Sequence, residues 1–87
     1  MGTSSPDKPD ISYPTRWSYR IVGTSEEAIR SLVLGLLINV EHELVVRRRS
    51  SGGRYISLDL SLIVQDEEGR LAIYERLSRH DTIRFVI

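Results

Sequence analysis

Apolar and polar residues alternate with a period of two in the middle of the chain. Between residues 56 and 64, one side carries Ile56, Leu58, Leu60, Leu62 and Val64, and the other carries Ser57, Asp59, Ser61 and Ile63. A strand has this period because successive side chains point to opposite faces. Five aliphatic residues in strict alternation predict a central strand with one buried face.

Three further stretches show the same period. Residues 16–22 place Trp17, Tyr19 and Ile21 on one side, opposite three polar residues. Residues 41–49 alternate less regularly, with Glu43, Val45, Arg47 and Arg49 predicted to share one face, and their run of arginines is typical of an edge strand. Residues 82–87 predict a last strand with Ile83, Phe85 and Ile87 inward. The turn at residues 50–53 joins the second and third strands, and Gly53 is expected to supply a positive φ there.

Two helices are predicted between the strands. Thr24 and Glu27 have the spacing of a capping box, and an apolar stripe follows at helical spacing from Ala28 to Leu37. Asn39 suits a left-handed position just beyond this helix. Asp66 is a good N-cap for the second helix, whose predicted apolar stripe is Ile73, Tyr74 and Leu77.

The resulting order is strand, helix, strand, strand, helix, strand. Two right-handed split βαβ crossovers fold this order into an α+β, ferredoxin-like βαββαβ plait, in which a four-stranded antiparallel sheet carries both helices on one face. The single domain is predicted to span residues 14–87. Residues 1–13 are polar and lack periodicity, so we expect a disordered or loosely ordered N-terminal tail.

Composition narrows the function classes. The 12 basic and 12 acidic residues balance, which disfavours a nucleic-acid or anionic-membrane binder. Cysteine is absent, so thiolate catalysis, disulfides and zinc ribbons are excluded. The N-terminal residues lack the apolar core of a signal peptide, and the longest apolar run is far below the roughly 20 residues that span a bilayer. We therefore expect a cytoplasmic protein without nucleic-acid or membrane partners.

Several motifs resemble the YbeD-like family of small bacterial proteins. They are Pro14 with Trp17-x-Tyr19-Arg20-Ile21-Val22-Gly23, then Ser50-Ser51-x-Gly53-x-Tyr55-x-Ser57, and Tyr74, Glu75 and Leu77 in the second helix. The stretch 38–43 lacks the family's His-x-Pro-Gly-like loop. The resemblance implies a ferredoxin-like fold similar to the ACT regulatory domain, and it implies no established activity.

Two groups of residues are candidate binding sites. Gly23, Thr24 and Ser25 join a strand to a helix N-terminus, where backbone N–H groups can hold an anion or a ligand carboxylate, although a turn glycine and a capping box explain them fully and are favoured. The second group lies on the polar sheet face, where Arg16, Arg20, Arg47, Arg49 and Arg84 are expected to gather around Asp59, beside Tyr55 and Ser57. This face predicts a binding platform or a solvated surface with cross-strand charge pairs. Only Tyr55 is an aromatic residue there, which disfavours RNA recognition.

No catalytic pair follows from the spacing. His42 and His80 are isolated, so we expect no metal or cofactor. The sequence favours a non-enzymatic regulatory or interaction module that binds a protein partner or a small ligand, and that forms a weak homodimer through a sheet edge or the polar face. The alternative is a small phosphate-handling hydrolase of the acylphosphatase-like plait.

Overall fold

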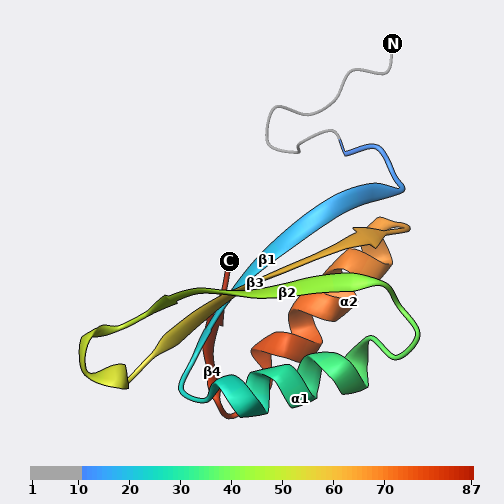
Figure 1. The fold of residues 1–87 in the computed structure, drawn as a ribbon. Coiled ribbons are helices and arrows are strands. Elements are labelled where there is room, and N and C mark those ends of the chain that lie inside the picture. The colour runs from blue at the N-terminus through green and yellow to red at the C-terminus, as the bar shows by residue number, and fades with distance from the viewer. Residues whose placement is uncertain (1–10) are drawn as a thin grey trace.

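The computed structural model describes residues 11–87 and shows the predicted plait. The elements are β1 (Thr15–Gly23), α1 (Glu26–Leu36), β2 (His42–Arg49), the short 3₁₀ helix η1 (Ser51–Gly53), β3 (Ile56–Val64), α2 (Glu67–Ser78) and β4 (Ile83–Val86). The strands form one antiparallel sheet in the order β2-β3-β1-β4. Both helices lie on the same side of the sheet, and the β2–β3 hairpin extends beyond them (Figure 1).

The core lies between the sheet and the two helices. The predicted alternation of β3 is confirmed, since Ile56, Leu58, Leu60, Leu62 and Val64 are all buried. Tyr19 and Ile21 from β1, Ile29 and Val33 from α1, and Leu77 from α2 complete the centre of the core. Each buried aliphatic side chain stabilises the fold by roughly 1.5–3 kcal/mol. The two inner strands, β1 and β3, are therefore held firmly in place and position the surface side chains.

The helix starts follow from side-chain caps. The Asp66 carboxylate accepts a hydrogen bond from the Gly69 N–H at 2.7 Å, which confirms the predicted N-cap of α2. The predicted capping box of Thr24 and Glu27 is wrong, because the Ser25 hydroxyl caps α1 by accepting from the Ala28 N–H at 3.1 Å. The Thr24 N–H donates to the Thr82 carbonyl at 2.9 Å, so Thr24 bonds to the segment before β4.

Two register shifts change which residues face the core. The β2–β3 pairing shifts between Val46 and Arg48, so Arg49 lies opposite the buried Ile56. The Arg49 guanidinium binds Glu26 at the start of α1 at 2.7 Å, so its predicted place on the polar face is wrong. An extra residue in one strand of an antiparallel pair causes such a shift, and strict alternation cannot represent it.

The second shift lies between β1 and β4, at Val22 and Gly23. Ile83 and Val86 are buried, whereas Phe85 lies opposite Val22 and is 51% exposed, and Ile87 is exposed. The predicted inward positions of Phe85 and Ile87 are therefore wrong, and that of Ile83 is confirmed.

The turns and the second helix complete the comparison. Asn39, Gly52 and Gly53 all have positive φ, as Gly53 and Asn39 were predicted to have. Tyr74 does not belong to the core stripe of α2, because it is 45% exposed. Tyr13 packs against the core just before β1, so the folded domain includes at least this residue of the predicted tail. Residues 1–10 of that tail lie outside the described residues.

Candidate binding face of the sheet

The side of the sheet opposite the helices is called the open face here. Its side chains come from all four strands: Arg16, Ser18, Arg20 and Val22 of β1; Ser57, Asp59, Ser61 and Ile63 of β3; Glu43, Val45 and Arg48 of β2, with Arg47, the extra residue in this strand, reaching Asp59; and Phe85 of β4. The pairing register sets this group, because residues opposite one another in an antiparallel pair point to the same face. Within residues 11–87 no helix covers this side (Figure 1).

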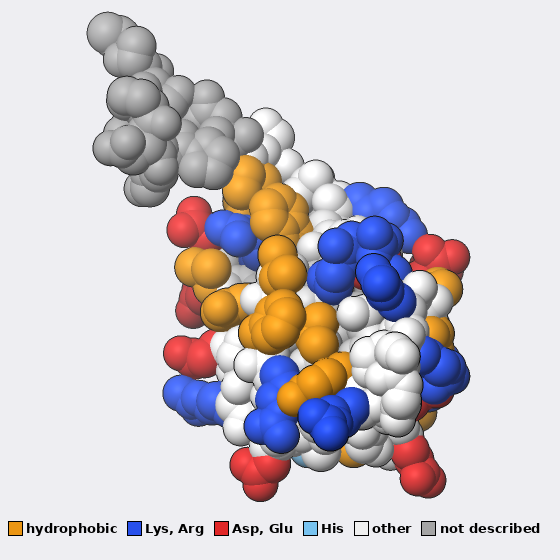
Figure 2. All heavy atoms as spheres, turned by 90° about the vertical axis from the view of Figure 1, so that its left-hand side faces the viewer, with side chains coloured by type: hydrophobic (Ala, Val, Ile, Leu, Met, Phe, Trp, Pro, Cys, Tyr) orange, Lys and Arg blue, Asp and Glu red, His pale blue; other side chains and the backbone are white. Residues whose placement is uncertain are grey.

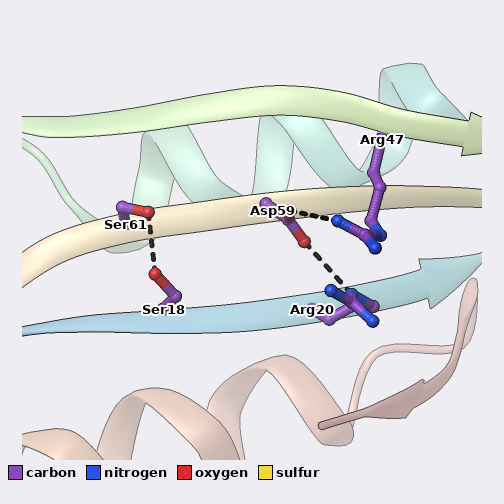
Figure 3. A network of polar contacts seen from close by, with 5 residues as sticks. All are labelled: Ser18, Arg20, Arg47, Asp59 and Ser61. Atoms are coloured by element: carbon purple, nitrogen blue, oxygen red, sulfur yellow. Dashed lines mark hydrogen bonds and ion pairs between the residues drawn. The ribbon is translucent and has the colours of Figure 1, made fainter.

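A row of charges crosses the three strands at the centre of the open face. Asp59 of β3 accepts from Arg20 of β1 through Oδ1 and from Arg47 of β2 through Oδ2, each at 3.4 Å (Figure 3). The three side chains are roughly one-third to one-half exposed, so each pair contributes only about 0–1 kcal/mol to stability. The structure thus confirms that Arg20, Arg47 and Asp59 meet, and it leaves their outer surfaces in contact with solvent.

Two further polar contacts extend this row along β1. The hydroxyls of Ser18 and Ser61 lie 3.0 Å apart in a cross-strand pair (Figure 3). Arg16 Nη2 lies 3.2 Å from Glu43 Oε1, and both side chains are mostly exposed. Cross-strand pairs of this kind hold side-chain positions more than they add stability.

Apolar side chains interrupt the polar surface. Val45, Ile63 and Phe85 are 55%, 47% and 51% exposed on the open face. They are spread over the face, since Ile63 lies opposite Arg16 and Phe85 lies opposite Val22 at the other end of β1. Large exposed apolar residues on one face are typical of a surface that contacts another molecule. Sequence reasoning missed Phe85 here, because the alternation of residues 82–87 assigned it to the core.

Tyr55 and Ser57 lie where β3 begins. Ser57 is opposite Val22 on the open face. The backbone of Tyr55 closes the hairpin, since its N–H donates to the Ser50 hydroxyl and its carbonyl accepts from the Ser50 N–H, each at 2.9 Å. The Tyr55 side chain is 40% exposed and takes no part in these two hydrogen bonds.

Gly23, Thr24 and Ser25 lie at the same end of the sheet, since Gly23 is opposite Ile56. A Cβ at Gly23 would lie 2.5 Å from the Thr82 carbonyl oxygen, so close packing against the β4 segment explains this glycine. The Thr24 N–H and the Ser25 hydroxyl are already bonded within the chain. Internal contacts therefore account for the groups that were predicted to bind a ligand.

Glu26 follows this corner. It accepts hydrogen bonds from Arg30 at 2.8 Å and from Arg49 at 2.7 Å. Hydrogen bonding to Arg30, and then to Arg49, lowers the pKa of the Glu26 carboxyl. This negative charge lies beside the position where an anion was predicted to bind, which opposes anion binding.

Hollows border the sheet that did not follow from the sequence. A shallow pocket of about 640 Å³ with a mixed polar and apolar lining lies at the start of β2, between Arg16, Asn39, His42 and Gln65. A smaller apolar groove of about 300 Å³ lies between β1 and α2 and includes Trp17, Leu71 and Tyr74. Within residues 11–87 no three His, Cys, Asp or Glu side chains are placed to hold a metal ion. No helix among these residues is long and apolar enough to cross a membrane.

Comparison with known proteins places the fold in a bacterial group. The chain is 26% identical over 80 residues to an uncharacterized protein of Helicobacter pylori, covering 92% of this chain and 93% of that one. It is 27% identical over 70 residues to the uncharacterized protein Cj0253 of Campylobacter jejuni, covering 80% of each.

A solved structure supports the fold independently. The solution structure of HP0495 from H. pylori matches with a TM-score of 0.81 at 24% identity and covers 100% of this chain and 96% of that one. A second solution structure of HP0495 matches with a TM-score of 0.66 at 25% identity, covering 97% and 98%. These matches confirm the plait.

The family follows from a match that spans all of the described residues. The model of DUF493, described as a protein of unknown function, matches residues 8–87. This confirms the resemblance that the motifs of β1 and the β2–β3 hairpin indicated. The chain belongs to DUF493, the YbeD-like family of proteins of unknown function.

Proposed function

We propose that this chain is a non-enzymatic interaction module that binds a partner protein through the open face. The observation that carries the proposal is the set of exposed apolar side chains, Val45, Ile63 and Phe85, around a row of charges that is already held in place. Interface surfaces combine these features, because apolar contact supplies binding energy and arginine supplies directional hydrogen bonds.

The charges of the open face indicate the chemistry of the partner. Arg16, Arg20 and Arg47 face two carboxylates, Glu43 and Asp59. The excess of arginine favours a partner surface with acidic side chains at its centre and apolar side chains around them. Because the arginines are ordered before binding, less side-chain entropy is lost when the partner docks.

A regulatory role is the second part of the proposal. The resemblance to the YbeD-like family implies a fold similar to the ACT regulatory domain, and on that analogy a small ligand modulates partner binding. A ligand at Gly23, Thr24 and Ser25 would have to replace the internal hydrogen bonds of Thr24 and Ser25. Titration of the protein with amino acids, followed by calorimetry, tests this part, and the absence of heat would remove it. We place the module in the cytoplasm, because small secreted domains often depend on disulfides and this chain has no cysteine to form one.

The hydrolase alternative has weaker support. A phosphate-handling plait needs an arginine directed at a phosphate-binding loop, but Arg20 pairs with Asp59 on the open face. The loop after β1 leads into Glu26, whose charge repels a phosphate. Phosphatase activity that is lost in Arg20→Ala would restore this alternative.

The partner hypothesis is tested with matched surface variants. Val45→Ser combined with Phe85→Ser removes apolar surface from the open face, and Leu34→Ser combined with Ile38→Ser removes similarly exposed side chains from the α1 region. Native mass spectrometry of gently purified protein reports the mass of any bound partner or second copy. A partner that is retained by wild type and by the α1 variant, but lost by the open-face variant, supports the proposal. Equal retention by all three proteins, or a complex that is only a homodimer, contradicts it.

A further inference from the structure

The outer edge of β1 is only half covered by β4. Arg20 and Ile87 exchange both backbone hydrogen bonds, at 3.1 and 2.9 Å, and β4 pairs with β1 from Ile21 to Gly23. Backbone groups of alternate residues point to the same edge, so Arg16 and Ser18 direct their N–H and C=O groups outward beside Arg20. Within residues 11–87 no strand lies beside them.

An apolar groove lies next to this uncovered edge, on the helix side of the sheet. It has a volume of about 300 Å³ between Trp17 and Tyr19 of β1, Leu71 and Tyr74 of α2, and Ile87. Leu71, Tyr74 and Ile87 are 46%, 45% and 71% exposed. Figure 2 shows a band of apolar side chains down this side of the molecule, with basic side chains next to it.

Arg70 supplies a fixed positive charge in the groove. Its guanidinium lies 4.6 Å from the centroid of the Trp17 ring, and its Nε donates to the Tyr13 hydroxyl at 2.9 Å. Within residues 11–87 no carboxylate lies within 4 Å of it, whereas Arg16, Arg20, Arg30, Arg47, Arg49 and Arg79 each have one. The nearest acid along the helix, Asp66, bonds to the Gly69 N–H instead. Stacking and a hydrogen bond thus hold Arg70 in place, while its terminal N–H groups have no charged partner within residues 11–87.

We propose that the outer edge of β1 and this groove bind an extended peptide segment of a partner protein. The segment adds as a strand beside Arg16 and Ser18, whose backbone groups it pairs. Its groove-side residues are alternate ones, with apolar side chains against Trp17 and Leu71 and a carboxylate against Arg70. Strand addition of this kind takes affinity from the main chain and specificity from alternate side chains.

Charge selects a peptide over a second copy of this chain. A two-fold pairing of two β1 edges would bring Arg16, Arg20 and Arg70 of both copies toward one another. The carboxylates that balance Arg16 and Arg20 belong to Glu43 and Asp59, on the β2 and β3 side away from this edge. Like charges at a shared edge disfavour self-pairing, whereas they favour an acidic segment. The peptide uses the backbone edge of β1 and the groove on the helix side, whereas the open face uses side chains on the other side of the sheet. Variants at Arg70 and Leu71 therefore test this proposal without changing Val45 and Phe85.

The first step of the test selects ligands with the full chain. A library of random decapeptides displayed on phage is bound to immobilised protein, and we expect the recovered sequences to share alternating apolar residues with at least one Asp or Glu among them. Recovered peptides are synthesised and titrated into the ¹⁵N-labelled protein, where the amide signals of Arg16 and Ser18 and the indole signal of Trp17 are expected to shift. Peptides that leave the amide signals of Arg16 and Ser18 and the indole signal of Trp17 unshifted, or a library that yields no binder, overturn the proposal.

The second step uses variants of α2 that keep the fold. Arg70→Leu is expected to lower the affinity for the synthetic peptide by at least about tenfold, since a charge-assisted hydrogen bond is lost. Arg76→Leu is the matched control, because Arg76 lies on the same helix, is exposed, and forms no ion pair within residues 11–87. Leu71→Ser should lower the affinity of the protein for the peptide, and Arg76→Leu should leave this affinity unchanged. Equal affinity for Arg70→Leu, Leu71→Ser and wild type overturns the assignment.

The third step tests the main-chain pairing. Methylation of the peptide nitrogens that face β1 should abolish binding, and methylation of the alternate nitrogens should not, because only one set donates to the sheet edge. Equal effects of the two sets would exclude strand addition. Concentration-dependent shifts of Arg16 and Ser18 without peptide would show that a second copy occupies the edge instead.

Discussion

Tyr19 carries a hydroxyl into the core, and Tyr19→Phe isolates its contribution. The side chain is 2% exposed, and its hydroxyl donates to the Arg70 carbonyl at 2.7 Å. A hydrogen bond of this kind contributes about 0.5–1.5 kcal/mol net, so Tyr19→Phe should lower the free energy of unfolding at pH 8 by about 1 kcal/mol. In a domain of this size, that loss lowers the melting temperature by about 4–8 °C.

The pH dependence of stability gives a sharper test of the same contact. Burial raises the pKa of Tyr19 from 10.0 to about 12, against the opposing effect of the Arg70 charge. Because the folded pKa is the higher one, the stabilisation is complete below pH 10.0 and declines as the pH rises toward about 12. The decline approaches about 1.4 kcal/mol per pH unit, for the one proton that the unfolded chain releases first.

Tyr19→Phe lacks this proton, so its stability should not show that part of the decline. The two stability curves are expected to cross near about pH 11, where the loss in wild type equals the hydrogen-bond term of about 1 kcal/mol. Urea unfolding followed by circular dichroism at pH 8 to 11.5 measures both curves. Tyr74→Phe is the control, because it removes the hydroxyl of a 45% exposed tyrosine and should unfold like wild type at pH 8.

One result would refute this reasoning. A constant difference between wild type and Tyr19→Phe from pH 8 to 11.5 would mean that Tyr19 ionises as readily in the folded state as in the unfolded state. The hydroxyl would then be solvated, and the contact with the Arg70 carbonyl would not exclude water. The packing of α2 against β1 beside the groove would need revision.

Four further substitutions test single contacts and backbone positions of the fold. Gly23→Ala should destabilise by about 1–3 kcal/mol in thermal unfolding, because its Cβ would lie 2.5 Å from the Thr82 carbonyl, and wild-type stability would show that β4 can move away freely. Gly53→Val should lower the free energy of unfolding by roughly 1–2 kcal/mol, because φ is +71° there, and an unchanged melting temperature would contradict this. Gly35→Ala, in α1 with open space around it, should leave the free energy of unfolding unchanged or raise it. Glu26→Gln should lower stability at neutral pH, and the deficit should vanish as the pH falls through the depressed pKa of Glu26, since a lowered carboxyl pKa stabilises only above that range. A deficit that persists in acid would assign the effect to something other than charge.

The sequence predicted the features that depend on local periodicity. The alternation of β3 and the N-cap Asp66 were sufficient to identify two elements and, with the element order, the plait. The meeting of Arg20 and Asp59 also followed, because a regular antiparallel register between β1 and β3 brings them opposite each other. These predictions hold because each depends on a pattern within one element, or on a pairing without irregularity.

The groove and the exposed aromatics depend on where elements end relative to one another. Tyr74 has the spacing of a core residue, yet it is exposed because α2 continues past the part of β1 that β4 covers. Phe85 is exposed because one register shift moved the alternation of β4 by a residue. A bulge depends on the partner strand as much as on its own residues, so periodicity alone cannot locate it.

The bulge in β2 can be tested directly by deleting Arg47. In the structure Arg47 is the extra residue, since Val46 is opposite Leu58 and Arg48 is opposite Ser57. Its deletion should leave a regular pair of strands in which Arg49 still faces Ile56 and still binds Glu26. The pKa of the Glu26 carboxyl, followed by NMR titration, should therefore stay below its ordinary value in the deletion variant and rise in Arg49→Gln.

Strict alternation makes the opposite prediction for the same variant. If β2 had no bulge, Arg49 would lie on the open face in wild type and would reach Glu26 only after the deletion. The pKa of Glu26 would then fall on deleting Arg47, and Arg49→Gln would leave the wild-type value unchanged. Arg47→Ser keeps the residue count and serves as the control, because it removes the contact with Asp59 without changing the register. A single titration series thus decides whether the sequence pattern or the observed pairing sets the face of Arg49.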